Sequence, residues 1–171
     1  MNNKIIILAS LLLSMISTVN AEEKAYAEIG FGSLAVEDSG WRFVPKIGRL
    51  IIGTKVMDGL AIEGMAAVGF VDSSVGGITL KVNNAVGLYA RPFVNVGDSV
   101  ELYARLGYFK GAMTISGAGG SISDSGSGVS YGGGIAFKIT PTTAATIDYM
   151  SYYDKDGIQI YGATVGARYA F

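Results

Sequence analysis

Apolar residues occupy every second position in one segment after another of this chain, and this period of two constrains its fold more than any other feature. The segment Tyr161–Phe171 is typical, because its odd positions are aromatic or apolar and its even positions are small or polar. Successive side chains of a β-strand point to opposite faces, so each such segment has one apolar face and one small, polar face. We therefore predict an all-β protein.

Eight such segments can be traced, and residues typical of turns separate them. Asp58-Gly59 is a strong hairpin signal, and Pro92 is expected at a strand end because proline donates no ladder hydrogen bond. The strands are predicted at residues 25–32, 44–56, 60–71, 79–93, 100–108, 131–139, 144–153 and 161–171. Longer connections follow the first, third, fifth and seventh strands, and short turns follow the second, fourth and sixth. This asymmetry is typical of an eight-stranded antiparallel up-and-down transmembrane β-barrel with its short turns in the periplasm.

The face opposite the apolar one carries glycine in most segments, together with the charged side chains. An eight-stranded barrel has an interior only just wide enough for side chains, so small residues belong on the inward face. An arginine or lysine that faces lipid at the bilayer midplane costs about 2–4 kcal/mol, so charges belong inside as well. We predict that ten charged side chains form a network in the lumen: Glu28, Arg49, Lys55, Glu63, Arg91, Glu101, Arg105, Lys138, Asp148 and Arg168.

A soluble barrel or sandwich, with the apolar face turned to its core, is the alternative fold. Its other face would meet water and should be rich in Lys, Glu and Ser, whereas this face is rich in glycine and alanine. Lys46 is the exception to the charge pattern, because strict alternation points it outward; we expect it at the external rim or behind a β-bulge. Tyr161, Tyr169 and Phe171 are predicted to belong to aromatic girdles at the two membrane boundaries.

The first 21 residues are predicted to be a secretory signal peptide. Lys4 precedes the apolar stretch Ile5–Leu13, and Val19–Ala21 has the small residues typical of signal peptidase cleavage. The apolar stretch is too short to span a bilayer, which argues against the alternative of a retained anchor. The predicted domains are thus the signal peptide, 1–21, and the barrel, 22–171, whose net charge is −2 once Lys4 is removed. The chain has no cysteine for disulfides or a lipid anchor, and no basic patch for nucleic acid.

The strands, the stretch Leu102–Tyr108 (LYARLGY) and the closing residues ARYAF, 167–171, resemble a family of small outer-membrane barrels. That family includes opacity-type surface proteins and the transmembrane domain of OmpA-like proteins. The resemblance covers the chain after the signal peptide and implies a porin-like monomer in the cell outer membrane, in contact with outer-membrane lipid and lipopolysaccharide. Phe171 also resembles the signal that the barrel assembly machinery recognises, which implies that machinery as a partner.

Catalysis is not predicted for this chain. The barrel enzymes to which we compare it depend on a histidine as general base, and the chain contains none. The Gly/Ser runs within 109–130 lack the strand-to-helix context of a phosphate loop, and Asp154–Gly157 lacks the later ligands of a calcium loop. We therefore expect that the protein is not an enzyme and that it has no cofactor and no metal site.

The predicted lumen charges allow either a pore or a plug. Glu63 and Arg105 resemble the acid and base that pair inside OmpA-like barrels, and an exchange of partners there would open a narrow porin-like channel. Stable pairing would instead fill the lumen. We favour the plug, because eight strands leave little free bore and an unpaired buried charge is costly.

The preferred function lies outside the barrel, in a structural or surface-interaction role. Loops on a rigid scaffold are where contacts with a host or surface ligand would be made. The Gly/Ser-rich loop 109–130 is expected to be mobile and a poor rigid site. The loop that carries Glu37, Asp38 and Trp41 is therefore the better candidate contact.

Overall fold

The structure, a computed structural model, describes residues 25–155 and 157–171, so the predicted signal peptide, 1–21, lies outside the described residues. Nowhere in these two ranges does a helix reach the length and hydropathy needed to span a membrane. The described chain forms ten strands: β1 (Ala25–Asp38), β2 (Trp41–Phe43), β3 (Lys46–Met57), β4 (Leu60–Val71), β5 (Ser73–Val75), β6 (Ile78–Val96), β7 (Val100–Gly117), β8 (Gly120–Lys138), β9 (Thr143–Lys155) and β10 (Ile158–Ala170).

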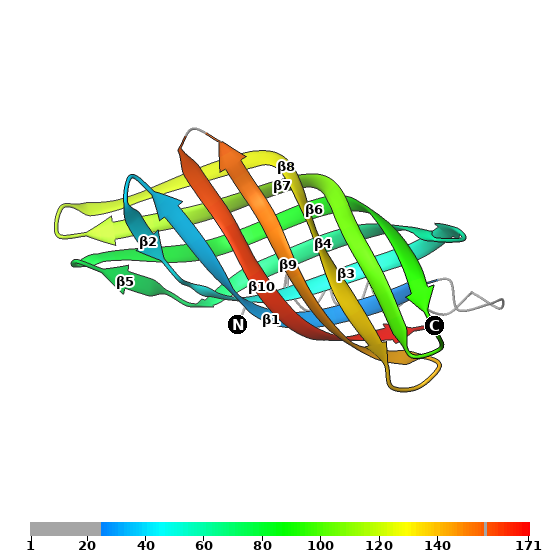
Figure 1. The fold of residues 1–171 in the computed structure, drawn as a ribbon. Helices are drawn as coiled ribbons and strands as arrows, with labels where there is room; N and C mark the ends of the chain where they lie inside the picture. Colours follow the sequence, from blue (N-terminus) through cyan, green and yellow to red (C-terminus); the bar gives the residue numbers. More distant parts are fainter. Residues whose placement is uncertain (1–24, 156) are drawn as a thin grey trace, which may run out of the picture.

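The eight long strands close into one antiparallel barrel (Figure 1). They pair in the order β10-β9-β8-β7-β6-β4-β3-β1, and β10 returns to β1 through a ladder that runs from Tyr26↔Ala170 to Asp38↔Ile158. The short strands lie off this path, since β2 pairs with β1 and β5 pairs with β6. Closure satisfies the backbone of the wall internally, as a β-structure in lipid requires. The predicted eight-stranded antiparallel barrel is confirmed.

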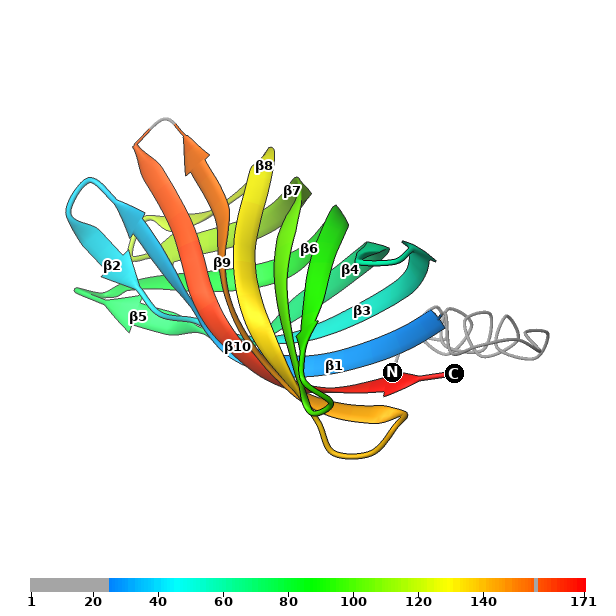
Figure 2. The same ribbon diagram turned by 45° about the vertical axis from the view of Figure 1, so that its right-hand side comes forward.

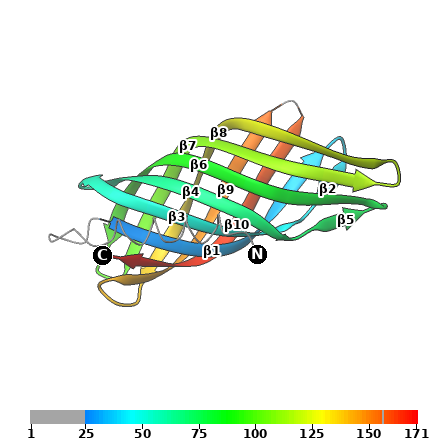
Figure 3. The same cartoon turned by 180° about the vertical axis from the view of Figure 1, so that it is seen from behind.

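The two ends of the barrel differ in how the strands are connected. The turns at 58–59, 97–99 and 139–142 lie at the end where β1 starts and β10 finishes (Figure 2). At the other end β2, β5 and the hairpin of β7 and β8 project beyond the wall (Figure 3). Bacterial outer-membrane barrels have short periplasmic turns and longer extracellular connections, so we place the projecting end outside the cell.

The strands are longer at the external end than the sequence predicts. Residues 109–130, predicted to be a loop, instead continue β7 and β8 as a ladder from Phe109↔Gly128 to Gly117↔Gly120. That prediction is wrong because the pairing of these strands, already in register from Val100↔Phe137, outweighs the weak strand propensity of glycine and serine. The first strand likewise continues past residue 32 to Asp38.

Pro92 does not lie at a strand end, as predicted, because β6 continues to Val96. Its pairing with β4 does end at Leu60↔Pro92. On the β7 side the ladder passes from Ala90↔Leu106 to Phe93↔Tyr103 without a pair at Pro92. The wall therefore tolerates the missing donor by omitting the pairing there.

A β-bulge on β9 changes which face a side chain occupies. The β9–β10 ladder passes from Ile160↔Tyr153 to Tyr161↔Ser151, which leaves Tyr152 as an extra residue. A single extra residue moves the side chains beyond it to the other face, so Tyr153, which strict alternation would turn to the lipid, lines the interior of the external end. The β3–β4 register also shifts, from Lys46↔Val71 to Ile47↔Gly69, but the extra residue is Phe70 on β4. Lys46 therefore stays on the outward face at the external end of β3, which is the rim position expected for it.

The outward face of the wall is apolar, as the alternation predicts. In β4, for example, Glu63 and Met65 are buried, while Ile62 and Val68 on the opposite face are exposed. Large exposed apolar side chains occur on every barrel strand: Phe31, Leu50, Val68, Leu88, Leu106, Phe137, Ile147 and Val165. A continuous apolar band of this extent is the surface that a transmembrane barrel presents to lipid.

Aromatic pairs lie at both ends of the outward face of β10. The ring of Tyr161 is 6.0 Å from that of Tyr149, and the ring of Tyr169 is 6.5 Å from that of Phe171. Tyr161 and Tyr169 span the nine residues that a transmembrane strand typically needs. Their positions are those expected of the two girdles.

Candidate functional site

Side chains fill the lumen as an ionic layer toward the periplasmic end and an apolar layer toward the external end. Of the ten predicted lumen charges, the structure buries eight: Glu28, Arg49, Glu63, Arg91, Glu101, Arg105, Asp148 and Arg168. These are four carboxylates and four guanidinium groups, so the ionic layer has no net charge. The residues come from β1, β3, β4, β6, β7, β9 and β10, which means that the layer connects almost the whole wall.

Lys55 and Lys138, predicted in the same network, are exposed and line the periplasmic mouth of the barrel. Lys138 Nζ donates to Asn95 Oδ1 at 2.8 Å. The prediction that these two lysines belong to the buried network is therefore wrong. Alternation along a strand fixes the face on which a side chain lies but not its height in the barrel.

Arg105 is the centre of the ionic layer. Its Nε donates to Glu63 Oε2 at 2.5 Å, its Nη1 to Asp148 Oδ2 at 2.6 Å and its Nη2 to Glu28 Oε2 at 3.3 Å. The planar guanidinium thus contacts three carboxylates from three different strands. The predicted pairing of Glu63 with Arg105 is present, but as one arm of a larger cluster.

Arg49 shares two of these carboxylates. It donates to both oxygens of Asp148, at 3.0 and 2.5 Å, and to Glu28 Oε1 at 3.1 Å. Its Nη1 also donates to the hydroxyl of Tyr152 at 3.1 Å. Bidentate contacts of this kind are the strongest hydrogen-bonded ion pairs in proteins.

Arg91 and Arg168 meet at Glu101, closer to the periplasmic end. Their guanidinium groups donate to Glu101 Oε1 at 2.5 and 2.8 Å. Arg91 Nε also lies 3.3 Å from Glu63 Oε1, and its guanidinium carbon lies 4.0 Å from the ring centroid of Tyr103. The lower part of the layer is therefore coupled to the Arg105 cluster through Glu63.

Tyrosines complete the layer, and sequence reasoning assigned them no role. Tyr26 donates to Glu63 Oε1 at 2.6 Å, and Tyr103 donates to Asp148 Oδ2 at 3.3 Å. Tyr89 donates to Ser130 Oγ at 3.2 Å. Alternation already placed Tyr26 and Tyr103 on the charged face, and this position among charges was the signal for their hydrogen-bonding role.

The inward glycines provide the space that these rings need. A Cβ atom on Gly134 would lie 2.6 Å from the Tyr103 hydroxyl, and one on Gly87 would lie 2.6 Å from Tyr89 Cε2. Real side chains do not approach so closely, so each ring covers a neighbouring glycine: Gly134 is paired with Tyr103 across the β7–β8 ladder, and Gly87 lies two residues from Tyr89 on β6. This explains why glycine and tyrosine share the inward face of such a narrow barrel.

Above the ionic layer the lumen is apolar, a feature that the sequence analysis missed. The buried residues of this layer are Leu34, Val36, Phe43, Ile47, Ile51, Met65, Leu80, Val82, Phe109, Met150 and Ile160. Several of them lie in segments that were predicted to be loops. The available signal was the presence of Ile51, Met65 and Met150 on the glycine-bearing face.

Little free space is left inside the apolar layer. A cavity of only about 10 Å³ lies within it, with Met65, Phe109 and Tyr152 among its lining residues. Such a volume is at the lower limit for one water molecule. The packed side chains therefore narrow the lumen at this height.

A closed barrel with an apolar outer band and a filled, charge-balanced lumen defines the class of transmembrane β-barrel proteins. The chain belongs to the family described as outer membrane protein beta-barrel domain, whose model matches residues 6–171. It is therefore an outer-membrane protein, with the all-β architecture of that family.

Several solved structures share the fold. Ail of Yersinia pestis is 21% identical, with a TM-score of 0.66 over 88% of this chain and 100% of that chain. Neisserial surface protein A is 12% identical, with a TM-score of 0.69 over 86% and 97%. The N-terminal barrel domain of Pseudomonas aeruginosa OprF is 12% identical, with a TM-score of 0.62 over 84% and 97%. No curated protein of similar sequence was found.

Proposed function

We propose that this chain is a sealed outer-membrane barrel with a structural and surface-interaction role, in which the external hairpins make the functional contacts. The observation that supports this proposal is the filled lumen, where four arginines and four carboxylates neutralise each other beneath an apolar layer. A barrel closed in this way has its adaptable surface outside the membrane. The extended β7–β8 hairpin and the strands β2 and β5 supply that surface.

The packing argues against the alternative of a narrow channel gated by Glu63 and Arg105. A gate would require Arg105 to exchange partners, but Arg105 contacts three carboxylates at once. Releasing one of them leaves the others in place, and releasing all of them leaves several buried charges unpaired. That cost makes the cluster a plug.

Conductance measurements test the sealed lumen. We expect the purified barrel, reconstituted in a planar phospholipid bilayer, to give no steady single-channel steps, because the buried ion pairs and the apolar layer fill the lumen. An established porin in the same bilayer serves as the positive control. Reproducible steps of one amplitude from the wild-type barrel would contradict the proposal and favour the channel.

The charged side chains at the external end affect which kind of molecule the hairpins can bind. One structure of Yersinia pestis Ail is a complex with the heparin analogue sucrose octasulfate, which is a polyanion. In this chain the charged residues described toward the external end are evenly divided: Glu37, Asp38, Asp72, Asp124 and Asp154 against Arg42, Lys46, Lys81, Lys110 and Lys155. The balance gives no reason to extend polyanion binding to this chain.

Outward lysines support lipopolysaccharide as a lipid partner. Lys46, Lys81 and Lys110 are exposed on the outer surface of β3, β6 and β7, toward the external end. Lys110 follows directly on Tyr108 and Phe109, at the point where the apolar band ends. Ammonium groups at this height are placed to contact the phosphates of the outer leaflet.

We expect the triple variant Lys46→Gln, Lys81→Gln, Lys110→Gln to retain less lipopolysaccharide than wild type when the barrel is extracted gently. The amount of co-purified lipopolysaccharide per barrel is the measurement. The single variant Lys138→Gln at the periplasmic mouth is the control, since it removes a charge far from the outer leaflet. Equal retention by all three proteins would contradict the assignment.

The barrel assembly machinery stays a predicted partner. The outward face of β10 ends in Tyr169 and is followed by Phe171, whose amide donates to the carbonyl of Ala25 at 2.9 Å. This strand therefore combines the apolar pattern expected of a recognition signal with the pairing that closes the barrel.

A further inference from the structure

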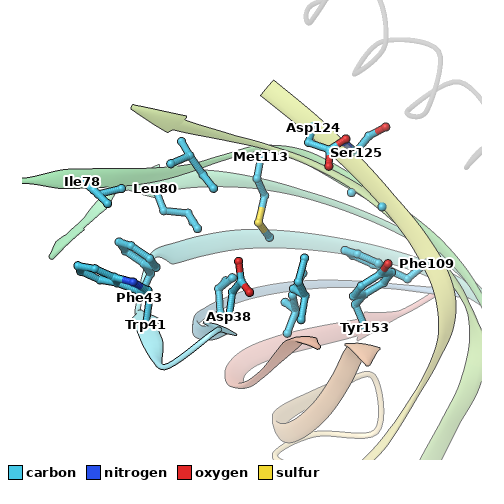
Figure 4. A pocket seen from close by; sticks show the side chains of 16 residues that line it. Asp38, Trp41, Phe43, Ile78, Leu80, Phe109, Met113, Asp124, Ser125 and Tyr153 are labelled. Atoms are coloured by element: carbon cyan, nitrogen blue, oxygen red, sulfur yellow. The ribbon is translucent and has the colours of Figure 1, made fainter. Parts of the chain in front are cut away.

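An apolar pocket of about 270 Å³ opens at the external end, above the sealed lumen (Figure 4). Strands β1, β2, β6, β7, β8, β9 and β10 all contribute to its wall. Its lining side chains include Asp38, Trp41, Phe43, Met113, Asp124 and Tyr153. The volume is close to that of pockets that hold small ligands.

The charged side chains that line the pocket are both negative. Asp38 and Asp124 are its two carboxylates, and both are exposed toward solvent; no lysine or arginine occurs among the described residues that line it. Asp38 accepts a hydrogen bond from Ser39 Oγ at 2.9 Å, and Asp124 accepts one from the Ser125 amide at 2.7 Å. An anionic molecule would be repelled here, whereas a cation would be attracted.

Aromatic rings strengthen the preference for a cation. The rings of Trp41 and Phe43 lie stacked with centroids 6.4 Å apart on one side of the pocket, and Tyr153 lies on the other (Figure 4). The faces of such rings attract ammonium groups, most strongly for tryptophan. The remaining wall is aliphatic and suits an apolar body.

We propose that this pocket binds a small apolar molecule that carries a cationic group, such as a short alkylammonium compound. Because an apolar cavity of about 150 Å³ accepts benzene, the pocket admits an apolar body of roughly ten heavy atoms. The apolar body occupies the space around Met113, and the cation lies near Asp38 or Asp124. The proposal depends on one part of the proposed function, namely that this end of the barrel faces the outside of the cell.

A stretch of β8 beside the pocket is not paired with β9. The β8–β9 ladder begins at Tyr131↔Ser151, so β8 from Gly120 to Ser130 pairs with β7 alone. The Tyr153 ring lies beside this segment, since a Cβ on Gly126 would be 3.3 Å from it. A rotation of that ring would widen the entrance without the loss of any ladder hydrogen bond.

The chain contains its own reporter for the test. Trp41 is the single tryptophan of the sequence, and it lines the pocket. The barrel in phospholipid nanodiscs is titrated with octyltrimethylammonium, and in parallel with octanoate, which has a chain of similar length and the opposite charge. We expect a saturable change in Trp41 emission, and protection from acrylamide quenching, at about tenfold lower concentration for the cation.

Three variants distinguish binding in the pocket from partition into the lipid. The double variant Asp38→Asn, Asp124→Asn is expected to lose the tenfold preference, and Met113→Lys is expected to abolish the response to the cation by placing an ammonium group in the apolar space. Ile122→Lys is the matched control, because Ile122 lies on the same hairpin, is 76% exposed and does not line the pocket. It should respond as wild type does, and heat-modifiable gel mobility confirms that each variant is folded.

Two results would overturn binding in the pocket: a Trp41 response that does not saturate in wild type, or one that is the same in Met113→Lys as in Ile122→Lys, as simple partition into lipid would give. An equal response to octanoate would overturn the choice of a cationic ligand. Channel activity in the planar bilayer would contradict the sealed lumen but leave this titration unaffected, so the two failures are distinguishable.

Discussion

Replacing Arg105 by methionine is expected to lower the free energy of unfolding of the barrel by about 3–5 kcal/mol, the usual cost of removing one partner from a buried ion pair. Methionine fills part of the vacated volume but leaves Glu28, Glu63 and Asp148 without the group that contacts all three. Their negative charge then lies in the lumen with fewer compensating donors. Urea-induced unfolding in phospholipid vesicles, followed by gel mobility without heating, measures the change.

Lys138→Met is the matched control for this prediction, because Lys138 is an exposed cation at the periplasmic mouth. We expect its free energy of unfolding to stay within about 0.5 kcal/mol of wild type. Glu63→Ala should change stability in the same direction as Arg105→Met, since Arg105, Arg91 and Tyr26 all lose a partner. If both lumen variants kept wild-type stability and wild-type conductance, the stabilising role of the pairing would be disproved.

Placing an arginine on the outward face at mid-height should also be costly. Val165 is 57% exposed and lies four residues from both Tyr161 and Tyr169, which puts it at the centre of the apolar band on β10. We expect Val165→Arg to lower the free energy of unfolding in phospholipid vesicles by about 2–4 kcal/mol, because the charge must leave water.

Ile122→Arg provides the comparison for Val165→Arg. Ile122 is even more exposed, at 76%, but lies on the β7–β8 hairpin beyond the apolar band. Its substitution should change stability by no more than about 0.5 kcal/mol, as is usual for a solvent-exposed position. Equal losses in the two variants would show that exposure, and not contact with lipid, determines the cost.

The period of two predicts the closed barrel and its faces well, because it follows directly from strand geometry. Strand β4 has the predicted bounds, and its buried Glu63 and exposed Ile62 lie on the predicted faces. The identity of the buried ion cluster is also largely predictable, since eight of its ten expected members lie in it. A charge needs a partner wherever water is excluded, and only the lumen offers one.

Height along the barrel axis and long-range register could not be predicted in the same way. Lys55 and Lys138 have the right face, but strand tilt and turn positions bring them to the mouth. Residues 109–130 have the composition of a loop, and only their partners across the hairpin hold them in strands. The bulge at Tyr152, which turns Tyr153 inward, likewise depends on the pairing with β10.

The ionic layer also fixes the cross-section of the barrel. A wall joined only between neighbouring strands can be pressed from a circle toward an ellipse without the loss of a ladder hydrogen bond. Arg105 on β7 reaches Glu28 on β1, and Arg49 on β3 reaches Asp148 on β9, so these pairs form chords across the lumen. Flattening changes the length of these chords and so disturbs the ion pairs, which stiffens the barrel against lateral pressure from the bilayer.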